Sequence, residues 1–111
     1  MIQIPQGFRL AAANADFRGK HLDRNDLSLA FSDVPATAAG VFTTNLFRAA
    51  PVLVSQENIK NSDEKGVRGV LFNSGQANAC TGEQGRENCL RTLDMVSAAL
   101  REAGENVSAD E

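Results

Sequence analysis

Apolar and polar residues alternate most regularly over residues 27–32, LSLAFS. Leucine or phenylalanine stands at every second position with a small or polar residue between, which predicts a strand with one covered face. Residues 8–13, FRLAAA, indicate a second strand, and the polar, glycine-containing connection between the two predicts a hairpin. Pro35 is expected to end the strand at 27–32, because proline has no backbone N–H.

Three further stretches are extended in character. A short piece is expected around residues 41–44, and Pro51 is expected to open another at 52–55, VLVS. The polar residues 56–66 are compatible with a short helical turn but are interpreted mostly as connection. Residues 67–72, VRGVLF, form a nearly continuous apolar run, which is typical of a strand covered on both faces.

A long amphipathic helix is predicted over about residues 82–103. Apolar residues recur there at intervals of four and three, which places them on one stripe of a helix. Thr81 and Gln84 have the spacing of a capping box at its start. Gly104 is placed to adopt the left-handed conformation that commonly ends a helix.

The expected fold class is α/β (α+β): a small sheet with this one long helix. A single amphipathic helix covers one side of a sheet, whereas the strand at 67–72 is predicted to be covered on both. We therefore expect another layer to come from polypeptide outside these residues. Because no repeat, low-complexity tract or linker divides the sequence, residues 1–111 are interpreted as one partial domain.

Composition narrows the functional classes. The chain has 111 residues, a net charge of −3 and no Trp or Tyr, which argues against nucleic-acid binding through a basic stripe or stacked aromatic residues. No stretch approaches the ~20 apolar residues that span a bilayer, and the N-terminus lacks the charged head of a secretory signal. A cytoplasmic location is expected. Cys80 and Cys89 flank the predicted helix start, too far apart for a disulfide, which suits that compartment.

The most unusual stretch is the connection at residues 73–82, NSGQANACTG. Its small residues allow a ligand or a second backbone to approach, and free amides at a helix N-terminus favour an anion. Its candidate site residues are Asn73, Asn78, Thr81 and Gly82. An ordinary structural interpretation stays open, since asparagine, threonine and glycine commonly serve turns and caps.

Other candidates have less support. His21 lies among charged turn residues, where an exposed side chain is expected rather than a general base. Cys80 is interpreted as a small buried residue, and Thr43 and Thr44 as ordinary strand residues. No phosphate-loop motif and no cluster with metal-ligand spacing occurs, so neither a nucleotide nor a metal is expected.

Two longer segments are more specific. SDVPATAAGVFTTNLFRAAPV at 32–52 and FNSGQANACTGEQG at 72–85 closely resemble the ornithine acetyltransferases of arginine biosynthesis, also called bifunctional glutamate N-acetyltransferases. The opening PQGFRLAAANA at 5–15 resembles the start of the same family, so the likeness runs through almost the whole chain in the family's order.

This resemblance implies a layered α-β-β-α sandwich that cuts itself before a threonine into associated α and β chains. The freed threonine moves an acetyl group from N-acetylornithine to glutamate through an acetyl-threonine intermediate. No cofactor is implied, although some members accept acetyl-coenzyme A as a substrate. The implied partners are the rest of the α chain and the β chain in a hetero-oligomer, with no nucleic acid and no membrane.

The sequence also departs from the family pattern. The Ala-Thr-Met-Leu cleavage motif is absent, since Ala36-Thr37 is followed by two alanines, and no Ser-Thr-Gly oxyanion segment occurs. We therefore expect an N-terminal part of an α chain, inactive alone and without catalytic residues. The four candidates of the 73–82 connection are then expected to support the active site from behind the groups that touch substrate, or to lie close to it.

Two alternatives remain. One is a related self-processing, aminopeptidase-like hydrolase, which would hydrolyse where the acetyltransferase transfers. The other is a free-standing module that binds a small anion at the N-terminus of its long helix.

Overall fold

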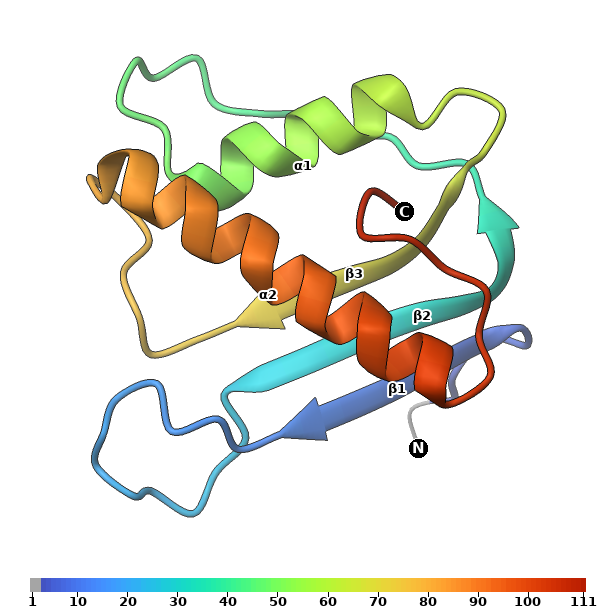
Figure 1. Cartoon of the computed structure of the whole chain (residues 1–111), viewed down its shortest axis with the longest axis horizontal. Coiled ribbons are helices and arrows are strands. Elements are labelled where there is room, and N and C mark those ends of the chain that lie inside the picture. The colour runs from blue at the N-terminus through green and yellow to red at the C-terminus, as the bar shows by residue number, and fades with distance from the viewer. Residues whose placement is uncertain (1–2) are drawn as a thin grey trace. The chain divides into compact units, whose positions relative to one another are not determined.

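The computed structural model describes residues 3–111, which contain three strands and two helices (Figure 1). In chain order these are β1 (Phe8–Ala13), β2 (Leu27–Ala36), α1 (Ala50–Asn61), β3 (Val67–Asn73) and α2 (Gly82–Glu102). The described residues fall into two compact units. The sheet unit comprises residues 3–36 and 68–77, and the helix unit comprises residues 37–67 and 78–111.

The sheet has the order β1-β2-β3. β1 and β2 are antiparallel, with Phe8 opposite Ser32 and each following residue in register. β3 also runs antiparallel to β2, as the arrows in Figure 1 show. The strands predicted at 8–13, 27–32 and 67–72 and the hairpin joining the first two are confirmed, and so is the mixed α and β fold class.

Pro35 does not end the second strand, so that prediction is wrong. β2 continues through it to Ala36. The pairing with β1 stops at Ser32, three residues earlier, so the missing N–H of Pro35 removes no hydrogen bond to β1.

The buried ring of the sheet unit is Phe31, at 4% exposure. The guanidinium carbons of Arg68 and Arg9 lie 4.7 Å and 5.1 Å from its centroid. Arg68 is itself buried, and its guanidinium donates to the backbone oxygens of Ser32 at 2.9 Å and Asp33 at 3.2 Å. A cation thus joins β3 to the middle of β2 at the position where the sheet is most buried.

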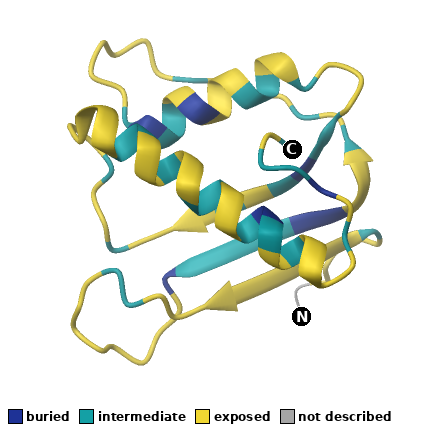
Figure 2. Cartoon of the chain, viewed as in Figure 1, coloured by how far each residue is buried: buried dark blue, intermediate teal, exposed yellow. Residues whose placement is uncertain are grey.

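Apolar side chains of the outer strands are exposed. Phe8 and Leu10 of β1 are 47% and 60% exposed, and Val70 and Phe72 of β3 are 50% and 53% exposed. Figure 2 shows β1 exposed along its whole length. Among the described residues, β3 is therefore not covered on both faces as predicted for residues 67–72.

α1 was not predicted from the sequence. The expected strand at 52–55 is helical, and residues 41–44 have no regular structure. Pro51 occupies the first turn of α1, where its missing N–H removes no helical hydrogen bond. A short apolar run does not by itself distinguish a strand from one buried turn of a helix. Here Val54 and Ala50, at 2% and 7% exposure, are the buried residues of α1.

α2 confirms the helix predicted at about 82–103. At its end, the Glu105 N–H bonds the Leu100 carbonyl at 3.0 Å and the Gly104 N–H bonds the Arg101 carbonyl at 3.0 Å. Gly104 has φ +97, the left-handed conformation that this paired termination requires and that glycine adopts without strain.

Within the helix unit α1 packs against α2, and Arg86 of α2 forms an ion pair with Glu57 of α1 at 3.0 Å. Fully buried apolar residues are few. Among the described residues no side chain is less than 2% exposed, and four apolar residues make up the core: Phe31, Ala50, Val54 and Val107. Both units therefore retain much apolar surface that a larger core would bury.

Candidate functional site

The first half of the 73–82 connection belongs to the sheet unit. Asn73 ends β3, and the Ser74 N–H donates to the Asp26 carbonyl at 2.8 Å. Gly75 has φ +85, and a Cβ built on it would lie 2.6 Å from Nε of Arg18. Glycine is therefore favoured there by its backbone conformation, whereas the exposed Arg18 side chain is flexible and can move aside. The Arg18 side chain lies along the position that a larger residue would fill.

Asp26 organises the same end of the sheet unit. Its carboxylate accepts the backbone N–H groups of Ala15 at 2.7 Å and Phe17 at 2.8 Å. Desolvation alone would raise the pKa of this carboxyl, but the backbone donors and nearby Arg24 outweigh it and hold the pKa below its usual value. Asp26 was not predicted as a site residue from the sequence, although an acidic residue just before an alternating strand was an available signal.

The second half of the connection belongs to the helix unit. The Thr81 hydroxyl donates to the backbone oxygen of Asn78 at 3.2 Å. Gly82 has φ +59 and is the first residue of α2. A Cβ built on Gly85, one turn later, would lie 1.8 Å from Oγ1 of Thr81. The absence of a side chain at Gly85 therefore makes room for the threonine at the helix start.

The capping box predicted at this start is wrong. Thr81 occupies the N-cap position but makes no side-chain bond to the helix backbone. The side-chain amide of Gln84 donates instead to Glu87 at 3.3 Å and Asn88 at 3.2 Å. Thr81 has ψ −2 rather than the extended backbone of a typical cap, and its hydroxyl hydrogen points back into the connection.

The structure brings two of the four candidate residues together. Asn78 and Thr81 share a hydrogen bond and Gly82 follows directly, whereas Asn73 belongs to the sheet unit and is described with it. Asn73 and Asn78 each make a further polar or electrostatic contact. The bond from the Thr81 hydroxyl to the Asn78 backbone oxygen fits the ordinary interpretation of these two residues as turn residues.

The remaining titratable candidates do not form a catalytic group. His21 is confirmed as exposed, with 92% of its side chain accessible and Nδ1 3.0 Å from Asp16. Cys80 is exposed, so its interpretation as a buried residue is wrong. Cys89 is half-buried, and desolvation raises the pKa of its thiol despite nearby Arg86. A protonated thiol is a weak nucleophile.

The two cysteines are free, as predicted. Among residues 3–111, no group of three or more His, Cys, Asp or Glu residues could hold a metal ion. Neither α1 nor α2 is long and apolar enough to cross a membrane.

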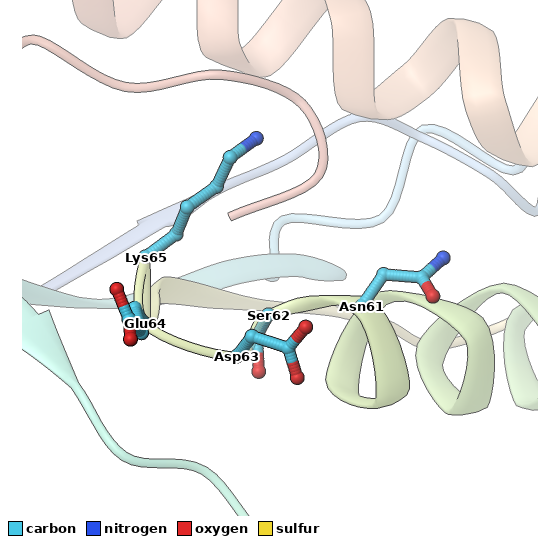
Figure 3. Close-up of a pocket in the computed structure, with 5 residues that line it drawn as sticks. All are labelled: Asn61, Ser62, Asp63, Glu64 and Lys65. Carbon is cyan, nitrogen blue, oxygen red and sulfur yellow. The ribbon is translucent and has the colours of Figure 1, made fainter.

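An open hollow lies at the turn between α1 and β3, and Figure 3 shows its lining side chains. The Ser62 hydroxyl donates to the Ile59 carbonyl at 2.8 Å, and Lys65 extends away from the other labelled residues and pairs with Asp110 at 3.3 Å. The Ser62 hydroxyl thus satisfies a carbonyl at the end of α1, and Lys65 contacts the segment that follows α2. The hollow is lined by Asn61, Ser62, Asp63, Glu64 and Lys65, and the hydroxyl of Ser62 donates to a backbone carbonyl rather than to a carboxylate that could act as its base.

Comparison with known proteins places these features in one family. The arginine biosynthesis bifunctional protein ArgJ of Nitratidesulfovibrio vulgaris is 57% identical over 99 residues, covering 89% of this chain and 24% of that protein. The mitochondrial ArgJ of Arthroderma otae is 44% identical over 84 residues, covering 76% of this chain and 18% of that protein.

A solved structure agrees. The ornithine acetyltransferase of Mycobacterium tuberculosis, complexed with ornithine, matches with a TM-score of 0.85 and 41% identity, covering 96% of this chain and 53% of that chain. The chain thus spans about a quarter or less of the curated relatives, from 24% to 18%, and about half of the solved chain. The ArgJ family pattern matches residues 9–109, and the chain therefore belongs to the ArgJ family.

Proposed function

We propose that this chain is part of an acetyltransferase that moves an acetyl group from N-acetylornithine to glutamate in arginine biosynthesis. The observation that carries the proposal is the agreement of sequence and fold: 41% identity and a TM-score of 0.85 to the ornithine acetyltransferase of M. tuberculosis. That protein was solved with ornithine, the product that remains when N-acetylornithine gives up its acetyl group.

In this proposal the reacting threonine and the oxyanion donors lie on polypeptide beyond this segment. The cleavage motif and the Ser-Thr-Gly segment are absent from the sequence. The described residues offer a half-buried thiol of raised pKa and an exposed histidine, which together give no activated nucleophile. The segment alone is therefore proposed to be inactive.

The relative lengths support processing into two chains. The same segment covers 24% of the N. vulgaris relative but 53% of the solved M. tuberculosis chain. The ratio of 24 to 53 makes the solved chain roughly half as long as that relative. We propose that the complete protein likewise yields an α chain, containing this segment, and a β chain, which associate as a hetero-oligomer.

The exposed apolar strands support the same partnership. Phe8, Leu10, Val70 and Phe72 present apolar surface that a second layer from the remainder of the protein would cover. A layered α-β-β-α sandwich supplies such a layer. We propose no resident cofactor, with acetyl-coenzyme A as an alternative acetyl donor, and a cytoplasmic location that suits the two free cysteines.

Asn78, Thr81 and Gly82 are proposed to position the active site without touching the reacting atoms, and Asn73 is proposed to act similarly at the end of β3. The hydrogen bond from Thr81 to Asn78 fixes the turn before α2, and a displaced turn would shift whatever packs on it. Misplacing a reacting group by about 1 Å can reduce the rate by ~100-fold.

The test of the function is an assay of the complete protein with N-acetylornithine and glutamate. The expected result is ornithine and N-acetylglutamate in equal amounts, detected by mass spectrometry, with no product from the 111-residue chain alone. Hydrolysis of peptides without acetyl transfer would overturn the proposal in favour of an aminopeptidase-like enzyme. Binding of a small anion by the isolated, well-folded chain, with no activity in the complete protein, would favour a free-standing module.

The test of the positioning role uses Thr81→Val, which removes the hydroxyl but keeps the shape. The expected result is a fall in kcat of about 10-fold or more with a smaller change in KM, recovered by Thr81→Ser. Thr92→Val is the matched control, because Thr92 makes a comparable bond to the Asn88 carbonyl at 2.8 Å further along α2. Equal losses in both variants, or no loss in either, would contradict the positioning role.

A further inference from the structure

A loop of the helix unit presents three apolar side chains to solvent. Residues 41–47, here the 41–47 loop, include Val41, Leu46 and Phe47, which are 102%, 91% and 82% exposed. They are the three most exposed large apolar side chains among the described residues. Side chains of this kind, when held close together, mark a surface that contacts another polypeptide.

The exposure does not come from a lack of local structure. The Asn45 N–H donates to the Thr43 hydroxyl at 3.2 Å, and the Phe47 N–H donates to the Asn45 side-chain oxygen at 2.9 Å. Directly after the loop, Arg48 donates to Gln56 of α1 at 3.0 Å. Local polar bonds thus hold the backbone while the apolar side chains face outward.

Phe42 is the apolar residue of the loop that packs against its own unit. It is half-buried, and its ring approaches to 2.9 Å of the position that a Cβ on Gly40 would occupy. The Ile59 side chain of α1 lies 3.2 Å from the same point. Phe42 therefore anchors the loop to its own unit, whereas Val41 beside it is left facing solvent.

We infer that the 41–47 loop is a docking surface for the polypeptide that ArgJ proteins have beyond this segment. This inference rests on the proposed function and names a contact within it. The segment covers only 24% of the N. vulgaris relative, so three-quarters of that protein remains to supply the partner surface. The loop's three exposed apolar side chains carry no charge, and the matching surface is accordingly apolar.

The experiment measures binding of the 111-residue chain to the part of the N. vulgaris relative beyond the matched quarter. The two polypeptides are co-expressed, separated and titrated by calorimetry. The test variants are Phe47→Ser and the triple variant Val41→Ser, Leu46→Ser, Phe47→Ser. Because these side chains are exposed, circular dichroism of the free chain should not change.

Wild-type chain is expected to bind the remainder, Phe47→Ser to bind about 10-fold more weakly, and the triple variant to lose at least 100-fold. Phe47→Leu should restore most of the affinity. Met95→Gln is the matched control, because Met95 is a 64% exposed apolar residue on α2 of the same unit, and its change should leave affinity within about 3-fold.

Four results would overturn the docking surface: no binding by the wild-type chain, equal binding by the triple variant, an equal loss with Met95→Gln, or self-association of the chain that the triple variant abolishes. The last would assign the loop to a contact between copies. The acetyl-transfer assay of the complete protein judges the proposed function separately, so either proposal can fail while the other stands.

Discussion

The buried groups of the sheet unit are mostly polar, whereas those of the helix unit are mostly apolar. Phe31 is the buried apolar residue of the sheet unit, alongside the polar residues Asp26, Ser32 and Arg68. The helix unit buries Ala50, Val54 and Val107 with one polar residue, Ser97. The sheet unit is thus ordered by directed bonds to backbone groups, and the helix unit by packing between its helices.

This difference in buried groups explains why neither unit buries much apolar surface. Directed bonds fix the strand ends and loops of the sheet unit, but they bury little apolar area, and burial of apolar area is the dominant driving force of folding. The helix unit buries more apolar residues than the sheet unit, although the apolar side chains of its 41–47 loop are exposed to solvent. Each unit has defined local structure and few buried apolar residues of its own.

The largest expected effect is that of Arg68→Ala in the sheet unit. It removes two charge-assisted bonds to β2 carbonyls and the guanidinium packed on Phe31. We expect the complete protein to lose about 3 kcal/mol of stability in urea denaturation. Arg9→Ala is the control, because Arg9 contacts the same ring but is half-exposed and should cost about 1 kcal/mol or less. Equal losses of stability in the two variants would show that the buried Arg68 stabilises the protein no more than the exposed Arg9 does.

Gly85→Ala in the helix unit should have the next largest effect. The new Cβ would lie 2.4 Å from Cβ of Thr81, which is too close for either to remain in place. We expect a net loss of about 1–2 kcal/mol, since alanine's better helix propensity offsets only part of the strain. At Gly69 of β3 a Cβ meets nothing nearer than 3.4 Å, so Gly69→Ala should change stability by about 0.5 kcal/mol. A harmless Gly85→Ala would show that the start of α2 is adaptable.

Asp26 should make the sheet unit sensitive to acid. Its pKa is lowered in the folded state, so its contribution to stability is present above the unfolded value of about 4 and is lost as pH falls through the folded pKa. The Ala15 and Phe17 amides should then exchange faster with solvent, as measured by NMR. In Asp26→Asn the same amides should lack this acid-dependent step, and an unchanged pH profile in that variant would contradict the role of the carboxylate.

The smallest effect is expected at the surface of the helix unit. Arg86 and Glu57 join α2 to α1, but their side chains are 34% and 54% exposed. Glu57→Gln should therefore cost about 0.5 kcal/mol, and the cost should fall at high salt. A loss comparable with that of Arg68→Ala would mean that ion pairs, not apolar packing, stabilise the helix unit.

The elements predicted correctly from the sequence are those with long or regular patterns. The alternation at 27–32 and the apolar stripe of α2 each repeat often enough to identify a strand and a helix. α1 was missed because VLVS is short and follows Pro51, and proline is tolerated both at a strand start and in a helical first turn. The capping box failed because a spacing of three residues does not fix the backbone angles of Thr81.

The candidate site was predictable only as a stretch of chain. The composition of residues 73–82 indicated an unusual connection, and two of its four candidates, Asn78 and Thr81, do share a hydrogen bond. Asp26 could not be linked to this connection from sequence, because the bond from the Ser74 N–H to its carbonyl depends on β2 and β3 being neighbours.

Thermal unfolding of the 111-residue chain, followed by circular dichroism, tests the central claim most directly. With few buried apolar residues in either unit, the chain alone should lose its helical signal gradually, and addition of the remainder of an ArgJ protein should produce a cooperative transition. A sharp transition of the chain alone, unchanged by the remainder, would contradict the claim that its core is completed by polypeptide from outside it.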